Sequence, residues 1–232
     1  MEATGLGIFM VSACLFGGLL ESHETIFHQL IPSAFLRTFI SGILMGLTAL
    51  FIFYSPFTSP SGAHINPAVT ITFYRLGKIN KTDTLFYILF QFAGATMAVV
   101  LMQWLMGSTL TSAPVNSIVT IPVNNKICNA FIIEFIIAFC MMSMVLFTSI
   151  DDRLKKYTRI IAAVMVCAYV IIAGPVSGFG MNPARSFASA VMANIWNSFW
   201  IYLLVPVASM LLAAECFLVI QQAKNKIYHP QQ

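Results

Sequence analysis

The sequence predicts an all-α membrane protein with six transmembrane helices and two half-helices that meet at the midplane of the membrane. Three observations predict it: a composition that is 59% hydrophobic and 9% charged, six apolar runs of spanning length, and an Asn-Pro-Ala tripeptide that occurs twice. A soluble domain carries roughly 25% charged residues. The mean hydropathy of +0.85 therefore indicates a chain embedded in lipid.

Six apolar runs approach the length of about 20 residues that a spanning helix needs. The predicted spans are residues 3–22, 35–56, 83–106, 128–149, 158–176 and 198–221. Two shorter apolar stretches, at about 67–77 and 183–193, each begin at an Asn-Pro-Ala tripeptide. At 1.5 Å per residue each stretch reaches about 15 Å. Two of them end to end cross the hydrocarbon core, which is about 30 Å thick.

The residue types in both tripeptides predict that a helix begins at each one. They consist of Asn66, Pro67 and Ala68 in the first half of the chain and Asn182, Pro183 and Ala184 in the second. Asn is a strong N-cap residue. Proline at the first helical position has a suitable φ, and it lacks an N–H that the helix could not use. Each tripeptide also follows a Ser-Gly pair, so the two copies need one explanation.

The chain reads as a single domain, 1–232, built from a repeat at about 1–106 and a second at about 128–221. Glu2 opens the first span and Glu134 lies early in the fourth, and each precedes an Asn-Pro-Ala by a further span and a loop. Three spans per repeat is an odd number, so the second repeat must be inverted in the membrane. Inverted repeats with broken helices are a known way to build a membrane pathway.

The positions of Lys and Arg predict the orientation, and the net charge of +4 is read by position rather than as affinity for nucleic acid. Six spans place most of these residues on one side: Arg75, Lys78, Lys81, Arg153, Lys155, Lys156, Arg159, Lys224 and Lys226. Arg37 and Lys126 fall on the other side. The positive-inside rule then places both termini in the cytoplasm. We expect a multi-pass protein of the plasma membrane.

The remaining segments favour neither an enzyme nor a metal or cofactor site. The sequence shows no nucleophile with a nearby base, no metal-ligand set and no nucleotide loop. The loop between the first two spans is expected to be solvated, although a metal site is conceivable there from Glu21, His23, Glu24 and His28. The loop at 107–126 is polar, and the short polar tail after Gln222 is expected to be disordered.

Two half-helices that start at the midplane would let neutral hydroxylated molecules pass while blocking protons and ions. Each N-terminus carries the positive end of a helix dipole, which repels cations, including hydronium. If the side-chain oxygens of Asn66 and Asn182 cap the helices, their amide NH2 groups are left to donate to a passing oxygen. Water held in this way cannot also accept from its neighbour, which interrupts a proton wire.

The peptide before each half-helix is expected to be extended and to line a water-filled path, because non-helical backbone is tolerated at membrane depth only there. The pore-lining candidates are Gly62, Ala63, His64, Gly178 and Gly180. Glu2 and Glu134 are expected to be structural, bracing these loops by accepting backbone N–H bonds.

The paired Asn-Pro-Ala motifs resemble those of the aquaporin, or major intrinsic protein, family, and the resemblance covers nearly the whole chain. Glu2 and Glu134 resemble the two buried acids of the family, Gln91 its third-span motif and Pro206 its sixth-span proline. The resemblance implies a homotetramer in membrane lipid, with one pore per subunit and no energy coupling.

The resemblance also implies a selectivity constriction built from four positions. Arg185, Phe179 and Val170 match three of them. For the second-span position, counting back from the first tripeptide leads to Gly46, whereas local alignment leads to Met45, and both stay open. Val170 replaces the His of strict water channels, and Phe179 adds an apolar wall, so the ring is expected to be wide and amphipathic.

The expected function is a passive channel for small neutral solutes, such as glycerol or urea, and for water, with protons and ions excluded. A strict water channel is one alternative. A channel for boric or arsenous acid is another, because segments near 174–178 resemble the nodulin-like intrinsic proteins. A coupled transporter is disfavoured, because no carboxylate cluster lies at the midplane beyond the two glutamates.

Overall fold

A computed structural model describes residues 1–228, with side chains through Ala223, and contains no strand in this range. Six of the described helices are long and apolar enough to cross a membrane. They are α1 (Glu2–Glu21), α3 (Ala34–Tyr54), α5 (Lys81–Met106), α7 (Ile127–Ile150), α8 (Thr158–Ser177) and α10 (Phe199–Tyr228). The predicted all-α membrane fold is confirmed, and most helix ends lie within two residues of their predicted positions.

The end of α10 differs from the prediction. Residues 223–228 continue the helix, so the expected disorder after Gln222 is wrong for this segment. Gln, Ala and Lys are good helix formers, and no Gly or Pro occurs between Gln222 and Pro230 to stop the helix. The expectation for residues 229–232, and the side chains of Lys224 and Lys226, lie outside the described residues.

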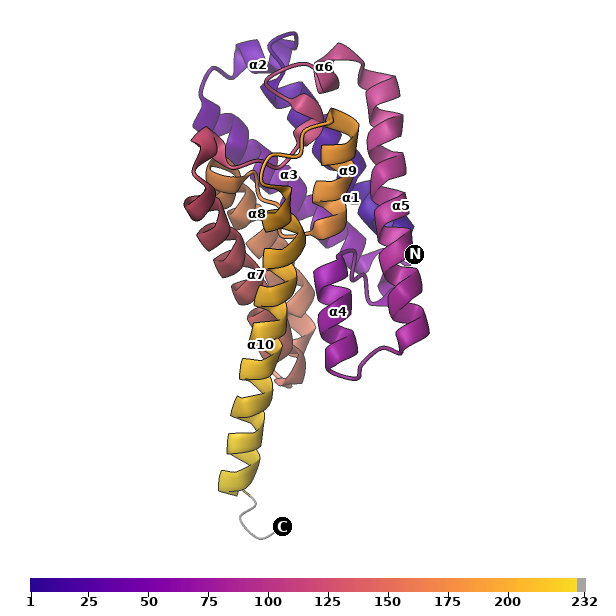
Figure 1. Ribbon diagram of the computed structural model, residues 1–232, viewed down its shortest axis with the longest axis vertical. Coiled ribbons are helices and arrows are strands. Elements are labelled where there is room, and N and C mark those ends of the chain that lie inside the picture. Colours follow the sequence, from indigo (N-terminus) through magenta and orange to yellow (C-terminus); the bar gives the residue numbers. More distant parts are fainter. Residues whose placement is uncertain (229–232) are drawn as a thin grey trace.

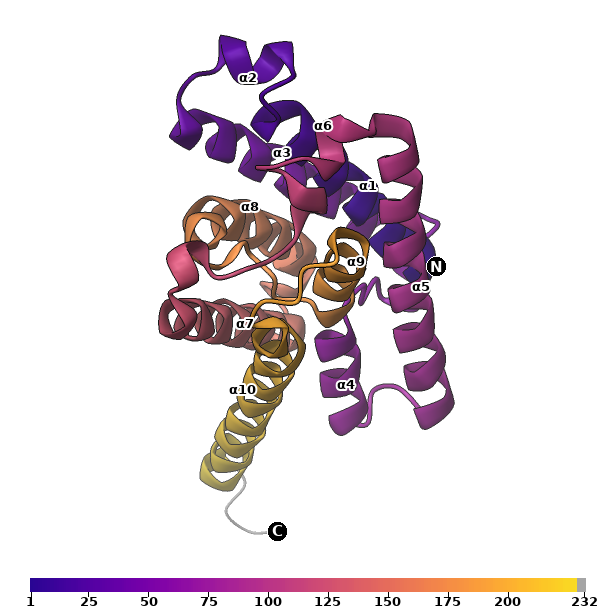
Figure 2. The ribbon, with the colours of Figure 1, turned by 45° about the horizontal axis from the view of Figure 1, so that its top comes forward.

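The two half-helices lie in the centre of the bundle. They are α4 (Pro67–Arg75) and α9 (Pro183–Ala193), and one lies above the other in Figures 1 and 2. The six long helices surround them. The N-terminal ends of α4 and α9 face each other, which is the arrangement expected from their lengths.

The helices pack in pairs that follow the internal repeat. α1 packs on α5 as α7 packs on α10, and α3 packs on α8 across the two repeats. Glycines allow the closest approaches. A Cβ built on Gly94 of α5 would lie 2.3 Å from the carbonyl oxygen of Ala3 in α1. A Cβ on Gly46 of α3 would lie 2.8 Å from the Cβ of Cys167 in α8. These contacts fix the positions of α1 and α3.

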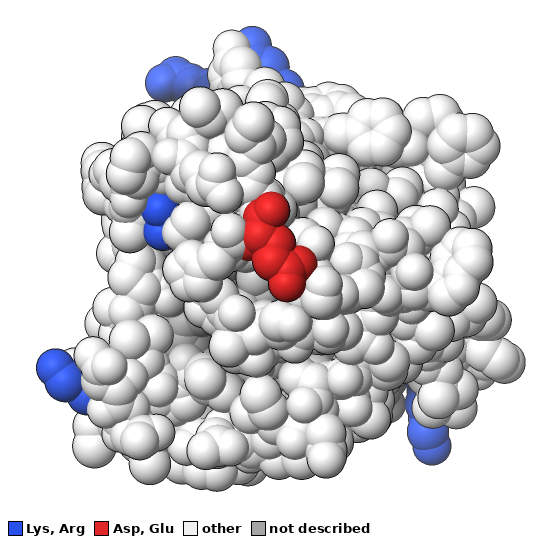
Figure 3. All heavy atoms as spheres, turned by 90° about the horizontal axis from the view of Figure 1, so that it is seen from above, with Lys and Arg blue, Asp and Glu red and all other residues white. Residues whose placement is uncertain are grey.

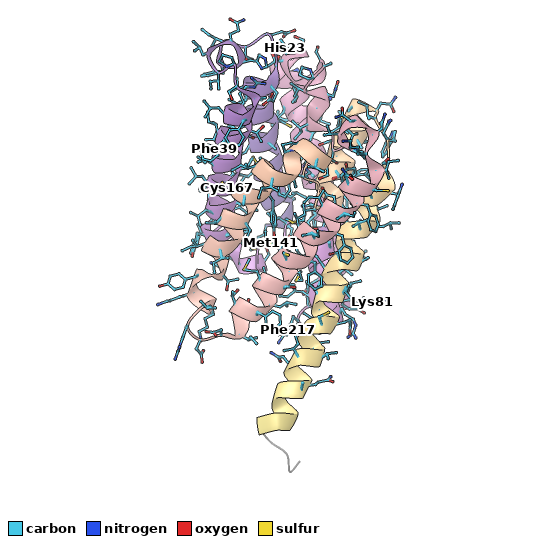
Figure 4. All side chains as sticks on the ribbon, turned by 90° about the vertical axis from the view of Figure 1, so that its left-hand side faces the viewer. His23, Phe39, Lys81, Met141, Cys167 and Phe217 are labelled. Carbon is cyan, nitrogen blue, oxygen red and sulfur yellow. The ribbon has the colours of Figure 1, made fainter. Side chains whose placement is uncertain are left out.

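Short helices, which the sequence did not predict, occupy the loops. They are α2 (Ile26–Leu30), α6 (Ser108–Thr111) and the 3-10 turns η1 (Ser59–Ser61), η2 (Asn116–Ile118), η3 (Val123–Asn125) and η4 (Lys155–Tyr157). His23 lies at the upper end of the bundle and Lys81 toward the lower end (Figure 4). In the upper loop, His23 Nδ1 lies 3.0 Å from His28 Nε2. The described residues contain no group of three or more His, Cys, Asp or Glu placed to hold a metal ion.

Candidate functional site

Each half-helix begins at an asparagine whose side chain caps it. Asn66 Oδ1 accepts a hydrogen bond from the backbone N–H of Ala68 at 2.9 Å. Asn182 Oδ1 accepts from the N–H of Ala184 at 3.1 Å and from that of Arg185 at 3.3 Å. The caps satisfy N–H groups that a helix start otherwise leaves unpaired. They also fix the direction in which each amide NH2 points.

The two asparagines lock the two half-helices together. Asn66 Nδ2 donates to the carbonyl oxygen of Met181 at 2.8 Å. Asn182 Nδ2 donates to the carbonyl oxygen of Ile65 at 2.7 Å. The expectation that the whole amide NH2 is free is therefore corrected. One of its two N–H groups is used by the opposite loop, and each asparagine keeps the other.

The loops before the half-helices have an unusual backbone. Ala63 and Ile65 have φ of 49° and 42°, and Phe179 and Met181 have φ of 51° and 50°. These values lie in the left-handed region, which costs roughly 1–3 kcal/mol per non-glycine residue and persists only when the surroundings impose it. The same pattern in both loops follows from the internal repeat.

Glu2 holds the first loop. Its Oε1 accepts from the N–H of His64 at 3.1 Å and from Ser61 Oγ at 2.6 Å. Its Oε2 accepts from the N–H of Ile65 at 2.6 Å and from Gln91 Nε2 at 2.7 Å. Three donors from the first loop and one from α5 therefore converge on one buried carboxyl group.

Glu134 holds the second loop in the same way. It is fully buried and accepts from the N–H of Gly180 at 2.8 Å and from the N–H of Met181 at 2.6 Å. Ser177 Oγ donates to it at 2.5 Å. Ser177, Gly180 and Met181 occupy the places that Ser61, His64 and Ile65 have in the first loop. The two carboxyl groups impose the strained backbone that points the carbonyl groups of Ile65 and Met181 across the midplane.

Two cavities lie beside the second pore loop, and the lower one is lined by Asn66 and Asn182. The lower cavity, of about 240 Å³, extends from Asn66 and Asn182 to Thr158 and Arg159 at the start of α8. The upper cavity, of about 150 Å³, extends from Phe179 toward the loop that holds Ile118. Each is large enough for more than one water molecule.

The loop residues singled out in the sequence divide between the cavities. The lower cavity is lined by Gly62, Ala63, His64 and Gly180, and the upper cavity by Gly178. The remaining tripeptide residues line neither cavity and are buried: Pro67, Ala68, Pro183 and Ala184.

The four predicted constriction positions meet in the upper cavity. Met45, Val170, Phe179 and Arg185 all line it. Gly46 lines neither cavity, because it faces α8 where the two helices approach closely. The structure therefore places Met45, and not Gly46, beside the other three residues.

Arg185 is the charged member of this group. Its exposed fraction is 8%, and its Nη1 donates to the carbonyl oxygen of Ile118 at 3.0 Å. Ile118 has a left-handed φ of 54°, as do its two predecessors in the η2 turn, near 44° and 54°. A guanidinium group has five N–H donors. Within residues 1–228 only this one bond is formed by the side chain, so the remaining donors are available to the upper cavity that Arg185 lines.

Sequence reasoning did not assign six residues of the upper cavity to the site. They are Phe9, Ala13 and Gly17 of α1, Ser41 of α3, Gly174 of α8, and Ile118. Phe9 is one of 20 phenylalanines in a largely apolar chain, so its residue type carries no signal. A weak signal exists in its spacing, because small residues follow it at helical intervals. Ile118 acts through its carbonyl group, which no side-chain pattern reveals.

The geometry agrees with comparisons to known proteins. A family model for major intrinsic proteins matches residues 3–217. The chain is 33% identical over 183 residues to aquaporin NIP1-2 of Arabidopsis thaliana, covering 77% of this chain and 62% of that protein. It is 33% identical over 162 residues to aquaporin NIP1-4 of Oryza sativa subsp. japonica, covering 69% and 58%. The chain thus spans about six tenths of the length of these relatives.

A solved structure shows the same fold. The aquaglyceroporin from Plasmodium falciparum superposes with a TM-score of 0.77 at 19% identity, covering 93% of this chain and 92% of that one. The match to the family model includes both half-helices and reaches from the start of α1 into α10. The chain belongs to the major intrinsic protein family, the aquaporin family of membrane channels, and not to a family of enzymes.

Proposed function

We propose that the chain is a passive channel for small neutral solutes, such as glycerol or urea, and for water, and that it excludes protons and ions. The observation that carries the proposal is the pair of cavities, the lower one lined by Asn66 and Asn182 and the upper one by Arg185. We regard residues 1–232 as one channel domain made of two inverted repeats.

The path offers hydrogen bonds on one side and apolar surface on the other. Donors are the remaining N–H groups of Asn66, Asn182 and Arg185, and these replace part of the water that a solute hydroxyl group sheds on entry. Phe9 and Phe179 supply carbon surface in both cavities. A molecule with hydroxyl groups along one edge and carbon along the other matches this lining.

Exclusion of protons follows from the two helix starts. Two positive dipole ends face the midplane and disfavour hydronium and other cations. The free N–H of each asparagine donates to the oxygen of a passing water, so that water cannot accept a proton from its neighbour. The bonds from Asn66 to Met181 and from Asn182 to Ile65 hold both amides in that orientation.

The upper ring favours solutes over a strict water channel. Three of its four members, Met45, Val170 and Phe179, present no hydrogen-bonding side chain, and Arg185 is the polar fourth. The strict water channel remains the runner-up. A channel for boric or arsenous acid is a further alternative, supported by the identity with NIP-type aquaporins.

The charge distribution supports cytoplasmic termini in a plasma membrane. Near the lower end, Arg75 is the last residue of α4, and the basic residues at 153–159 precede α8 or lie in its first turn. In Figure 3, which shows the molecule from above, most atoms belong to uncharged residues, acidic side chains gather in one place near the centre, and basic side chains lie toward the rim. Arg37 at this end is paired with Glu21 at 3.1 Å. A homotetramer is part of the same proposal and rests on family membership alone.

Light scattering of proteoliposomes after an osmotic shock tests the proposal, with sucrose, glycerol and urea in separate runs. Sucrose should produce rapid shrinkage only. Glycerol or urea should produce shrinkage followed by fast re-swelling, compared with protein-free liposomes. Shrinkage without accelerated re-swelling would establish the strict water channel in place of our proposal.

A further inference from the structure

Phe9 and Phe179 stand between the two cavities. Of the described residues, only these two line both. Phe9 belongs to α1 and Phe179 to the loop before α9, so they come from different repeats. A molecule that moves from one cavity to the other must therefore pass both phenylalanines.

Helix α1 narrows the path at Phe9. Phe9, Ala13 and Gly17 are spaced four residues apart, so they lie on one face of the helix, and all three line the upper cavity. Toward the upper end the side chain shrinks from a phenyl ring to a methyl group and then to a hydrogen. The bulk that α1 adds to the wall of this path is thus concentrated at Phe9.

Both rings are supported from behind, so the gap between them depends on side-chain size. The ring centroids of Phe179 and Tyr169 are 6.3 Å apart, and Phe179 is buried. Phe9 packs against the buried cluster that includes Met45 and also against the one that includes Ile65. Interiors packed in this way resist displacement of a large side chain.

We infer that Phe9 is a specificity-determining residue that sets, with Phe179, the widest solute that passes. The inference rests on the proposed function and deepens it. Phenyl side chains neither donate nor accept ordinary hydrogen bonds. A solute must therefore turn its carbon edge to them while Arg185 and the asparagines bind its hydroxyl groups. Slender unbranched polyols satisfy both demands, and longer or branched ones do so less well.

The test compares polyols of increasing length in proteoliposomes that contain wild-type protein, Phe9→Ala or Phe16→Ala. Phe16 is the matched control, because it lies on α1, packs against the same cluster around Met45 and lines neither cavity. Phe9→Ala should raise the ratio of erythritol to glycerol permeability about tenfold, the low end of what one methylene group costs in a fitted site. Phe16→Ala should leave this ratio unchanged.

A second variant keeps the test decisive if Phe9→Ala folds poorly. Phe9→Trp adds bulk and should lower glycerol permeability more than water permeability, and the water permeability shows that the variant is folded. An unchanged selectivity in both Phe9 variants, with a glycerol-permeable wild type, would overturn this inference alone. A wild type no more permeable to glycerol than protein-free liposomes would instead overturn the proposed function.

Discussion

Gly94→Ala should force α1 and α5 apart and thereby loosen the first pore loop. A Cβ on Gly94 would lie 2.3 Å from the carbonyl oxygen of Ala3 and 2.5 Å from its Cα. Both are backbone atoms of α1, so no side-chain rotation relieves the clash. An ordinary contact needs about 3.5 Å, which requires the helices to separate by about 1 Å.

The displacement reaches the pore loop through Glu2, which precedes Ala3. Glu2 Oε2 accepts from the N–H of Ile65 at 2.6 Å, and an added 1 Å would stretch this to about 3.6 Å, beyond the range of a hydrogen bond. Overpacking costs about 1–3 kcal/mol, and a buried N–H without a partner costs about 1–3 kcal/mol more. Gly94→Ala should therefore destabilise the protein by about 2–6 kcal/mol.

The same interface provides the control. A Cβ on Gly7 would lie 3.5 Å from the carbonyl oxygen of Gly94, which is an ordinary contact. Alanine is favoured over glycine inside a helix by about 1 kcal/mol, so Gly7→Ala should be neutral or stabilising. The assay is the melting midpoint in detergent by tryptophan fluorescence, with glycerol permeability measured in parallel. A Gly94→Ala variant as stable as wild type, or equal damage from Gly7→Ala, would refute the reasoning.

Three further predictions test other parts of the site. Val170→His adds a larger, polar side chain to the upper cavity and should cut glycerol permeability about tenfold while water still passes; undiminished glycerol flux in the osmotic assay would contradict the proposed ring. Asn182→Asp keeps the capping oxygen but replaces the donor to the Ile65 carbonyl by a carboxylate oxygen, and should admit protons. A pH-sensitive dye inside liposomes under a potassium diffusion potential measures this, and a tight variant would count against the asparagine mechanism. Arg75→Ala removes the ion pair between Arg75 Nε and Glu215 Oε1, which lie 2.8 Å apart on side chains that are 52% and 45% exposed. The substitution should lower the free energy of unfolding by less than about 1 kcal/mol. A large fall in melting midpoint would contradict this expectation and show that the pair is shielded from solvent.

Local chemistry explains why the helices were predictable. The spans follow from continuous apolar runs, and the half-helices from an Asn cap followed by Pro. The predicted end of α10 was wrong, because the sequence contains no Gly or Pro between Gln222 and Pro230 to stop the helix. Composition favoured disorder in this polar segment, whereas helix propensity and an attached helix favoured continuation.

The second-span position of the ring could not be assigned from the sequence pattern. Met45 and Gly46 are adjacent in a largely apolar helix, and the only nearby sign in the sequence is weak: Ser41 lies one turn before Met45 on the same face. The contact of Gly46 with Cys167 in α8 orients α3 and turns Met45 toward the cavity. The same limit applies to Phe9, whose role depends on the position of Phe179 in the other repeat.

By itself, the sequence determined the class of fold, the inverted repeat, the two helix starts and the buried position of Arg185, because each depends on nearby residues or on a motif that occurs twice. Tertiary structure alone decided which atoms meet at the midplane. Asn66 donates to Met181 and Asn182 to Ile65 across separations of 115 and 117 residues. Such bonds depend on backbone carbonyl groups, which every residue has, so only the folded arrangement selects the ones that line the path.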